Sequence, residues 1–258
     1  MRILAVGDVV SRCGVDYIAN NLKKLIKEKE IDFTVINGEN SFRGKGISKE
    51  ICDILFDSGA DCITLGNHAF SKKGVKKAFE TYSSNVLRPI NMGDNLSGKG
   101  YTVISKNGVE VGVINAIGRI YMAEACDPFS YIDLALKEME TKGIKIIIAD
   151  FHAEATSEKL AFGHYFDGRI SAVFGTHTHV PTADAKILRG GTGYITDIGM
   201  TGSKDGILGL KKESSINKIV FDITEPFEWC ETNPSLNGVI FDVCEETGKC
   251  TNIERIEY

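Results

Sequence analysis

The feature that most constrains this chain is a repeated pattern in which a short apolar run ends in a turn carrying a polar side chain. Ile3–Val6 is followed by Gly7-Asp8, and Phe33–Ile36 is followed by Asn37-Gly38-Glu39-Asn40. Between the runs lie stretches with apolar residues at helical spacing. Strands that alternate with helices are typical of an α/β domain, in which sites form at the carboxyl ends of the strands.

The same pattern predicts the other elements of the domain. It places helices around 18–26, at 47–56 with Ser48 as N-cap, and at 75–82, 131–141 and 156–163. Further strands are expected at 62–65, 101–104, 109–114, 144–149, 172–174, 183–188, 194–196, 236–243 and 251–256. Asn107-Gly108 predicts a hairpin between two of them. Late hairpins added to alternating strands indicate a mixed sheet or two stacked sheets covered by helices. No linker interrupts the chain, so we expect one domain over residues 1–258.

Charge and cysteine content exclude several classes of protein. The chain has 258 residues, with 30 Lys+Arg, 35 Asp+Glu and a net charge of −5. This balance disfavours an extended nucleic-acid surface but allows a small phosphorylated ligand. No apolar run approaches the ~20 residues of a membrane span, and an acid at Asp8 comes too early for a signal peptide. Seven scattered cysteines without a C-x-x-C pair favour reduced thiols and a cytoplasmic location.

The histidines point to metal chemistry. Four of the five histidines follow predicted strands: His68, His152, His177 and His179. Candidate ligands at these strand ends are Asp8, Glu39, Asn40, Asn67, His152, His177 and His179. Mixed nitrogen and oxygen ligands suit Mn, Fe, Co or Zn. The set is too large for one structural zinc, so it predicts two ions that share a bridging carboxylate.

The order of these motifs resembles that of the calcineurin-like metallophosphoesterases, and more narrowly their YmdB-type branch. The resemblance rests on Gly7-Asp8-Val9-Val10, Asn37-Gly38-Glu39-Asn40, Asp150–Lys159, Gly175–Val180 and Thr196–Gly202, and it covers most of the chain. It implies an α/β fold of four layers, an αββα metallophosphoesterase sandwich with two mixed β-sheets flanked by helices. It also implies a metal-dependent phosphoric diester hydrolase.

The resemblance also implies roles for individual residues. One ion would be held by Asp8, Glu39, Asn40 and His179, and the other by Glu39, Asn67, His152 and His177. Glu39 would bridge the two. The ions would be divalent, iron with manganese as substitute. A hydroxide between them would attack a small phosphodiester, a cyclic nucleotide such as 2′,3′-cAMP included, while His68 acts as general acid.

The sequence departs from the wider superfamily at three positions and leaves alternatives open. Glu39 stands where the bridging residue is usually an aspartate. Val10 stands where a first histidine is usual, and Asn40 fills its place. Ala69 follows the Asn-His pair, so no neighbouring carboxylate orients His68. Asp150 and Glu154 are equally candidates to support His152 or to have no role. A phosphomonoesterase, a hydrolase of non-phosphate bonds and a regulatory or RNA-associated scaffold are the other functions considered. The oligomeric state, a homo-oligomer included, stays open.

Overall fold

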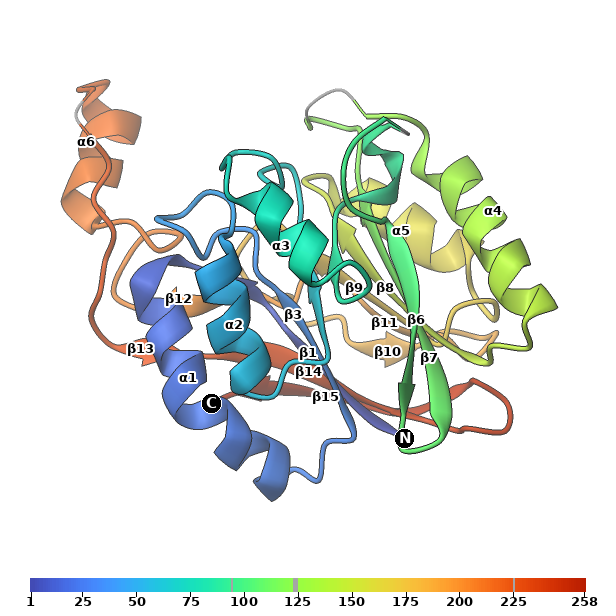
Figure 1. Ribbon diagram of the computed structural model, residues 1–258. Coiled ribbons are helices and arrows are strands. Elements are labelled where there is room, and N and C mark those ends of the chain that lie inside the picture. Colours follow the sequence, from blue (N-terminus) through green and yellow to red (C-terminus); the bar gives the residue numbers. More distant parts are fainter. Residues whose placement is uncertain (94, 123–124, 225) are drawn as a thin grey trace.

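Two stacked β-sheets with helices on both outer faces form the body of the computed structural model, which describes residues 1–93, 95–122, 125–224 and 226–258 (Figure 1). The first sheet has the strand order β15-β14-β1-β3-β4-β5. Its strands are β1 (Arg2–Val6), β3 (Phe33–Asn37), β4 (Cys62–Thr64), β5 (Val86–Leu87), β14 (Asn237–Val243) and β15 (Cys250–Glu257). The strands β1, β3, β4 and β5 are parallel to one another. β14 pairs antiparallel with β1, and β15 pairs antiparallel with β14.

The second sheet has the strand order β10-β11-β9-β8-β7-β6. Its strands are β6 (Tyr101–Lys106), β7 (Val109–Ile117), β8 (Ile146–His152), β9 (Ala172–Thr176), β10 (Lys186–Ile187) and β11 (Gly193–Ile195). The four central strands are parallel and the two edge strands are antiparallel, so both sheets are mixed. A third, small sheet joins β2 (Asp8–Val9), β12 (Met200–Ser203) and β13 (Pro234–Ser235).

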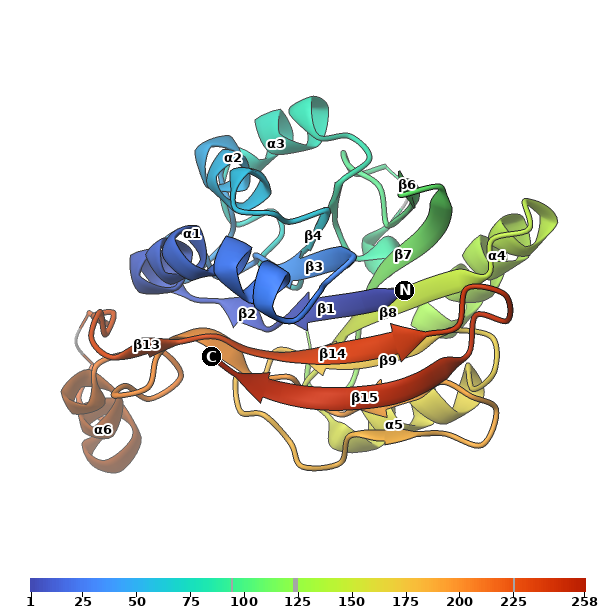
Figure 2. The same ribbon diagram turned by 90° about the horizontal axis from the view of Figure 1, so that it is seen from below.

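The helices divide between the two outer faces of the molecule (Figures 1 and 2). One face carries α1 (Ser11–Glu28), α2 (Lys49–Asp57) and α3 (Val75–Thr81), and the other carries α4 (Pro128–Thr141) and α5 (Thr156–Tyr165). A 3-10 turn, η1 (Ile90–Met92), precedes β6, and α6 (Lys212–Phe221) projects from the body. Within the described residues, no helix has the length and apolar character of a membrane span.

Three hydrophobic clusters separate the four layers, and strand alternation assigns each side chain to one of them. In β1, Leu4 and Val6 face the cluster beneath α1 and α2, whereas Ile3 and Ala5 face the cluster between the sheets. In β8, Ile148 faces the cluster between the sheets and Ile147 faces the cluster beneath α4 and α5. Because side chains alternate between the two faces of a strand, each sheet packs against a hydrophobic cluster on both faces. The two sheets are thus the central layers, which confirms the four-layer sandwich.

The sequence predictions for individual elements are confirmed with some shifts of boundary. Ser48 caps α2 by accepting a hydrogen bond from the Ile51 amide, and Asn107-Gly108 forms its turn with φ values of 53° and 82°. α4 begins at Pro128, earlier than predicted, because Asp127 caps it. β2, β5, η1, β12, β13 and α6 were not predicted. The strands among them have only two to four residues, too few to show a periodicity. α6 also buries Ser214 and Ser215 while exposing its apolar residues.

Candidate metal centre

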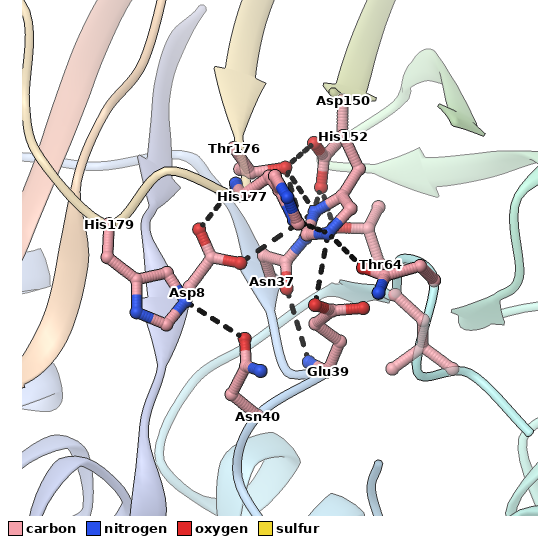
Figure 3. Close-up of polar contacts among 12 residues, drawn as sticks. Asp8, Asn37, Glu39, Asn40, Thr64, Asp150, His152, Thr176, His177 and His179 are labelled. Atoms are coloured by element: carbon pink, nitrogen blue, oxygen red, sulfur yellow. Dashed lines mark hydrogen bonds and ion pairs between the residues drawn. The ribbon is translucent and has the colours of Figure 1, made fainter. Parts of the chain in front are cut away.

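Loops from both sheets meet at one end of the sandwich and carry the predicted site residues (Figure 3). Asp8 follows β1, and the residues Glu39 and Asn40 follow β3. Asn67 and His68 follow β4, His152 ends β8, and His177 and His179 follow β9. The parallel strands of the two sheets therefore contribute their carboxyl ends to a single cluster, as expected for open α/β sheets.

Three potential metal-ligand atoms lie around one nitrogen of His152. Its Nε2 lies 3.0 Å from Asn67 Oδ1, 3.0 Å from Glu39 Oε1 and 3.1 Å from His177 Nδ1. The ligand atoms offered by Glu39, His152 and His177 all lie within 4.8 Å of one another. His152 and Glu39 are buried, and His177 is half-buried. These four residues form one half of the cluster.

A second group lies beside the first. His179 Nε2 is 3.3 Å from Asn40 Oδ1. Asp8 is completely buried, and its Oδ2 accepts a hydrogen bond of 3.1 Å from the His177 amide. Among the described residues, its other oxygen accepts no hydrogen bond. A buried carboxylate oxygen without a donor is costly, and a cation would satisfy it.

Hydrogen bonds behind His152 determine which of its nitrogens faces the cluster. The Thr176 hydroxyl donates to Asp150 Oδ1 at 2.7 Å, so its oxygen accepts from His152 Nδ1–H at 2.9 Å. Asp150 is held by two further donors, the Thr64 hydroxyl at 2.5 Å and the Asn37 amide at 2.9 Å. In its neutral form, with the one proton on Nδ1, His152 presents the lone pair of Nε2 to Glu39 and its neighbours.

The other two histidines are arranged in the same way. His177 Nε2 lies 3.1 Å from Glu154 Oε2, and His179 Nδ1 lies 3.4 Å from the Leu208 carbonyl oxygen. Each ring donates outward, which leaves His177 Nδ1 and His179 Nε2 as acceptors directed inward. Metal-binding histidines typically donate their second N–H to a carboxylate or carbonyl in this way.

The donor set therefore fits divalent cations. Every inward atom is either an imidazole nitrogen with a lone pair or a carboxylate or amide oxygen. These atoms are Asp8 Oδ1, Glu39 Oε1, Asn40 Oδ1, Asn67 Oδ1, His152 Nε2, His177 Nδ1 and His179 Nε2. Acceptors packed 3.0–3.3 Å from one another repel unless a positive charge lies between them. Nitrogen and oxygen ligands without a thiolate suit manganese, iron, cobalt or zinc.

The pKa values of the cluster shift in opposite directions. Burial raises the pKa of Glu39, but the charge and hydrogen bond of His152 together with His68 outweigh burial and lower that pKa to about 2. Burial lowers the pKa of His152, but Glu39 together with Asp8 and Asp150 outweighs burial and raises that pKa to about 9. Burial, followed by the charge of His152, lowers the pKa of His177 to about 3. A proton on His152 and a cation compete for the same nitrogen, so cation binding releases protons.

Backbone features allow this close approach. A Cβ on Gly66 would lie 2.3 Å from Glu39 Oε2 and 2.4 Å from His152 Nε2, so only glycine fits there. His177 and His179 adopt φ values of 99° and 64°, in the left-handed region that residues with a side chain rarely occupy. Such strain is concentrated at functional sites, where the surrounding structure holds it in place.

His68 occupies a different position from the other histidines. Its amide donates to Glu39 Oε2 at 3.0 Å, but its half-buried ring contacts only Asn67 and Ser71, each at 3.5 Å, among the described polar groups. Burial lowers the pKa of His68, and the ammonium of Lys45 acts in the same direction. As the residue after Asn67, it lies beside the ligand cluster, and its ring contacts the amide nitrogen of Asn67, not the inward oxygen.

The structure corrects the predicted supports of His152. Asp150 acts on His152 through Thr176 instead of contacting it, and Glu154 pairs with His177. Strand β8 extends to His152, so Asp150 and His152 share a face two residues apart. The contacts of Thr64, Thr176 and Asn37 were not predicted, because they join strands far apart in the sequence. Asn37 and Thr176 lie within motifs of the sequence, but a motif does not show what its side chains contact.

Comparisons with known proteins agree with this geometry. The family model described as YmdB-like protein matches residues 4–256. A 2′,3′-cyclic-nucleotide 2′-phosphodiesterase of Bacillus subtilis (strain 168) is 46% identical over 256 residues, covering 99% of this chain and 96% of that protein. A novel phosphatase from Mycoplasma pneumoniae has a TM-score of 0.92 and 33% identity, covering 100% of this chain and 93% of that one. A hypothetical protein from Thermus thermophilus has a TM-score of 0.93 and 36% identity, covering 100% and 99%.

Proposed function

The chain belongs to the YmdB-like family of calcineurin-like metallophosphoesterases, and we propose that it is a dinuclear-metal phosphodiesterase acting on cyclic nucleotides such as 2′,3′-cAMP. In this proposal residues 1–258 form one catalytic domain. The observation that carries it is the orientation of three histidines, each donating one N–H outward and directing a lone pair at carboxylate and amide oxygens.

The contacts support a division of the ligands between two ions. Asn40 and His179 face each other at 3.3 Å, and Asp8 and Glu39 would complete that set. Asn67 and His177 each lie near His152 Nε2, at 3.0 and 3.1 Å, and Glu39 would complete the other set. Glu39 is the bridging residue in this assignment. Iron, with manganese as its substitute, is the proposed pair of ions.

Two divalent ions supply a water ionised near neutral pH and neutralise charge on the phosphoryl oxygens. The protein supplies the rest. Glu39 accepts a 3.0 Å hydrogen bond from the His68 amide, which fixes the backbone position from which the His68 side chain extends. His68 lies at the edge of the cluster beside Asn67, where its protonated ring could give a proton to the departing sugar oxygen. Its lowered pKa makes the protonated ring a stronger acid and at the same time lowers the fraction of protein that carries this proton at neutral pH. His68 is thus the proposed general acid.

The substrate class is inferred from the Bacillus subtilis relative, a 2′,3′-cyclic-nucleotide 2′-phosphodiesterase that covers 99% of this chain. A second candidate is a phosphomonoesterase, which the Mycoplasma pneumoniae phosphatase favours. The two differ in the ester they cleave and share the fold and the site. A scaffold without activity is the third candidate, and it would tolerate loss of His68.

Hydrolysis of 2′,3′-cAMP beside a simple phosphomonoester tests the proposal. The protein is stripped of metal and reloaded with Fe²⁺ or Mn²⁺, with His179→Ala and His68→Ala alongside. We expect cleavage of the cyclic diester that returns with metal and is lost in both variants. Faster cleavage of the monoester would move the function to phosphatase. No turnover of either ester by protein that holds its metal would support the scaffold.

A further inference from the structure

A lysine is buried in the wall of the site. Lys159 lies in α5 with its side chain 1% exposed. Its ammonium donates to Asp197 Oδ2 at 2.7 Å and to the Thr176 carbonyl oxygen at 2.8 Å. A buried ion pair is weak support for stability, because desolvation of both charges offsets their attraction. The position of this pair suggests another role.

The pair holds the chain on both sides of His177. Lys159 binds the Thr176 carbonyl, which precedes His177. Asp197 Oδ2 accepts from the Thr178 amide at 3.2 Å, and that amide follows His177. Asp197 Oδ1 accepts from the Gly199 amide at 2.9 Å, which fixes the carboxylate itself. One ammonium and one carboxylate therefore bind the two peptide groups that flank this histidine.

His177 is the residue whose backbone needs such support. Its φ of 99° is strained for any residue with a Cβ, and strain of this kind persists only where neighbours over-determine the conformation. Its amide donates to Asp8 Oδ2, and its ring donates to Glu154. Those two contacts orient the amide and the ring. Lys159 shares the peptide before His177 with this Asp8 contact and with the Ala153 amide, which donates to the same Thr176 oxygen at 3.4 Å. The peptide after His177 is held by Asp197 through the Thr178 amide.

We propose that Lys159 and Asp197 are positioning residues, which hold the His177 backbone so that its Nδ1 stays 3.1 Å from His152 Nε2. The inference rests on the proposed function where it concerns metal, since His177 is there a ligand of one ion. The proposed effect of the pair on the His177 backbone does not depend on the proposed function. The alternative is that the pair only stabilises the packing of α5 against the second sheet.

The test compares Lys159→Met with the double variant Lys159→Met/Asp197→Asn. The single variant leaves a buried carboxylate unpaired and can unfold, whereas the double variant removes both charges. The Thr178 and Gly199 amides donate to different oxygens of the Asp197 carboxylate, and the amide introduced in the double variant has only one oxygen to accept them. Lys106→Met is the matched control, because Lys106 forms a 2.6 Å ion pair with Asp61 away from the cluster. Thermal unfolding confirms that each variant is folded.

Two readouts separate positioning from stability. Hydrogen exchange of the 176–180 peptide is measured on metal-free protein, and Mn²⁺ content per chain after reloading is measured by elemental analysis. For the folded double variant we expect at least about tenfold faster exchange in that peptide, and about one ion per chain where the parent holds about two. Unchanged exchange and metal content in a folded double variant would overturn the inference. A parent that binds no Mn²⁺ would refute the proposed function, and the exchange result would still decide the role of the pair.

Discussion

The Nδ1 of His152 lies 2.9 Å from the hydroxyl oxygen of Thr176, whose own proton is donated to Asp150. This short chain of hydrogen bonds has one direction, because the hydroxyl has a single proton and Asp150 takes it. Neutral His152 must therefore carry its proton on the side facing Thr176. The nitrogen facing Glu39 then has a lone pair free to bind a cation.

Replacing Thr176 by valine tests this relationship. Thr176→Val keeps the shape of the side chain but removes the acceptor that fixes the His152 tautomer. We expect metal affinity to fall about 10–100-fold, as is typical when the partner of a ligating histidine is lost. Titration of the stripped protein with Mn²⁺ measures the change.

Thr192→Val is the matched control for this variant. The Thr192 hydroxyl is also buried, and it donates to the Ile170 carbonyl oxygen, outside the ligand cluster. Its loss should lower the free energy of unfolding without affecting metal affinity. Equal losses of affinity in both variants would mean that Thr176 acts through general stability alone.

Gly66→Ala should disrupt the ligand cluster by steric overlap alone. The added Cβ would lie 2.3 Å from Glu39 Oε2, so Glu39 and His152 must move apart. We expect a stability loss of about 1–3 kcal/mol together with loss of metal binding. In the control Gly74→Ala, φ is −67° and the nearest atom is 4.0 Å away, so metal content should be unchanged. Normal metal content in Gly66→Ala would contradict the packing described here.

His68→Ala should separate catalysis from metal binding. The ring of His68 contacts Asn67 Nδ2 and Ser71, neither of them an inward ligand atom, so the variant should retain the parent's metal content. Its kcat on 2′,3′-cAMP should fall about 10²–10⁴-fold, the usual contribution of a general acid. His164→Ala, at the exposed fifth histidine in α5, should leave both unchanged. Loss of metal in proportion to activity would make His68 a ligand and refute its assignment.

Acid stability should depend on Asp184. Burial raises its pKa, but hydrogen bonds from Thr182 and Thr196 outweigh burial and lower it below the ordinary value. A carboxyl with a lowered pKa stabilises the fold above its unfolded pKa of about 3.9, and this stabilisation is lost as pH falls through the folded pKa. Asp184→Asn should therefore be less stable than the parent at pH 7, with the difference shrinking in acid.

Urea unfolding of the two metal-free proteins, repeated from pH 7 down to about pH 3, measures that difference. Metal-free protein is needed because protonation of the ligands would otherwise release ions over the same range. A gap in unfolding free energy that is constant with pH would show that Asp184 contributes through its shape and not through its charge.

The residues that meet in the cluster could be predicted from sequence because each follows an apolar strand within a few residues, as Asp8 and Glu39 do. The turn at Asn107-Gly108 and the cap at Ser48 were likewise local signals. The supports of the site were not predictable in this way. Lys159 meets Asp197 across 38 positions, and its burial inverts the usual preference of lysine for solvent.

Two stacked sheets also explain why Glu154, considered as a support of His152, contacts a different histidine. The sequence places Glu154 beside His152, two residues away in the chain. In the structure His152 ends β8 and points toward Glu39, whereas Glu154 reaches His177 after the neighbouring strand β9. Contacts between parallel strands override sequence neighbours at such an edge.

The inward lone pairs of three histidines, with the oxygens of Asp8, Glu39, Asn40 and Asn67, are proposed to hold two ions. Anomalous diffraction from a crystal of the parent protein loaded with Mn²⁺ tests this most directly. We predict two peaks separated by about 3.5–4 Å, with Glu39 contacting both, His179 beside one and His152 beside the other. One peak, or peaks away from these side chains, would contradict it.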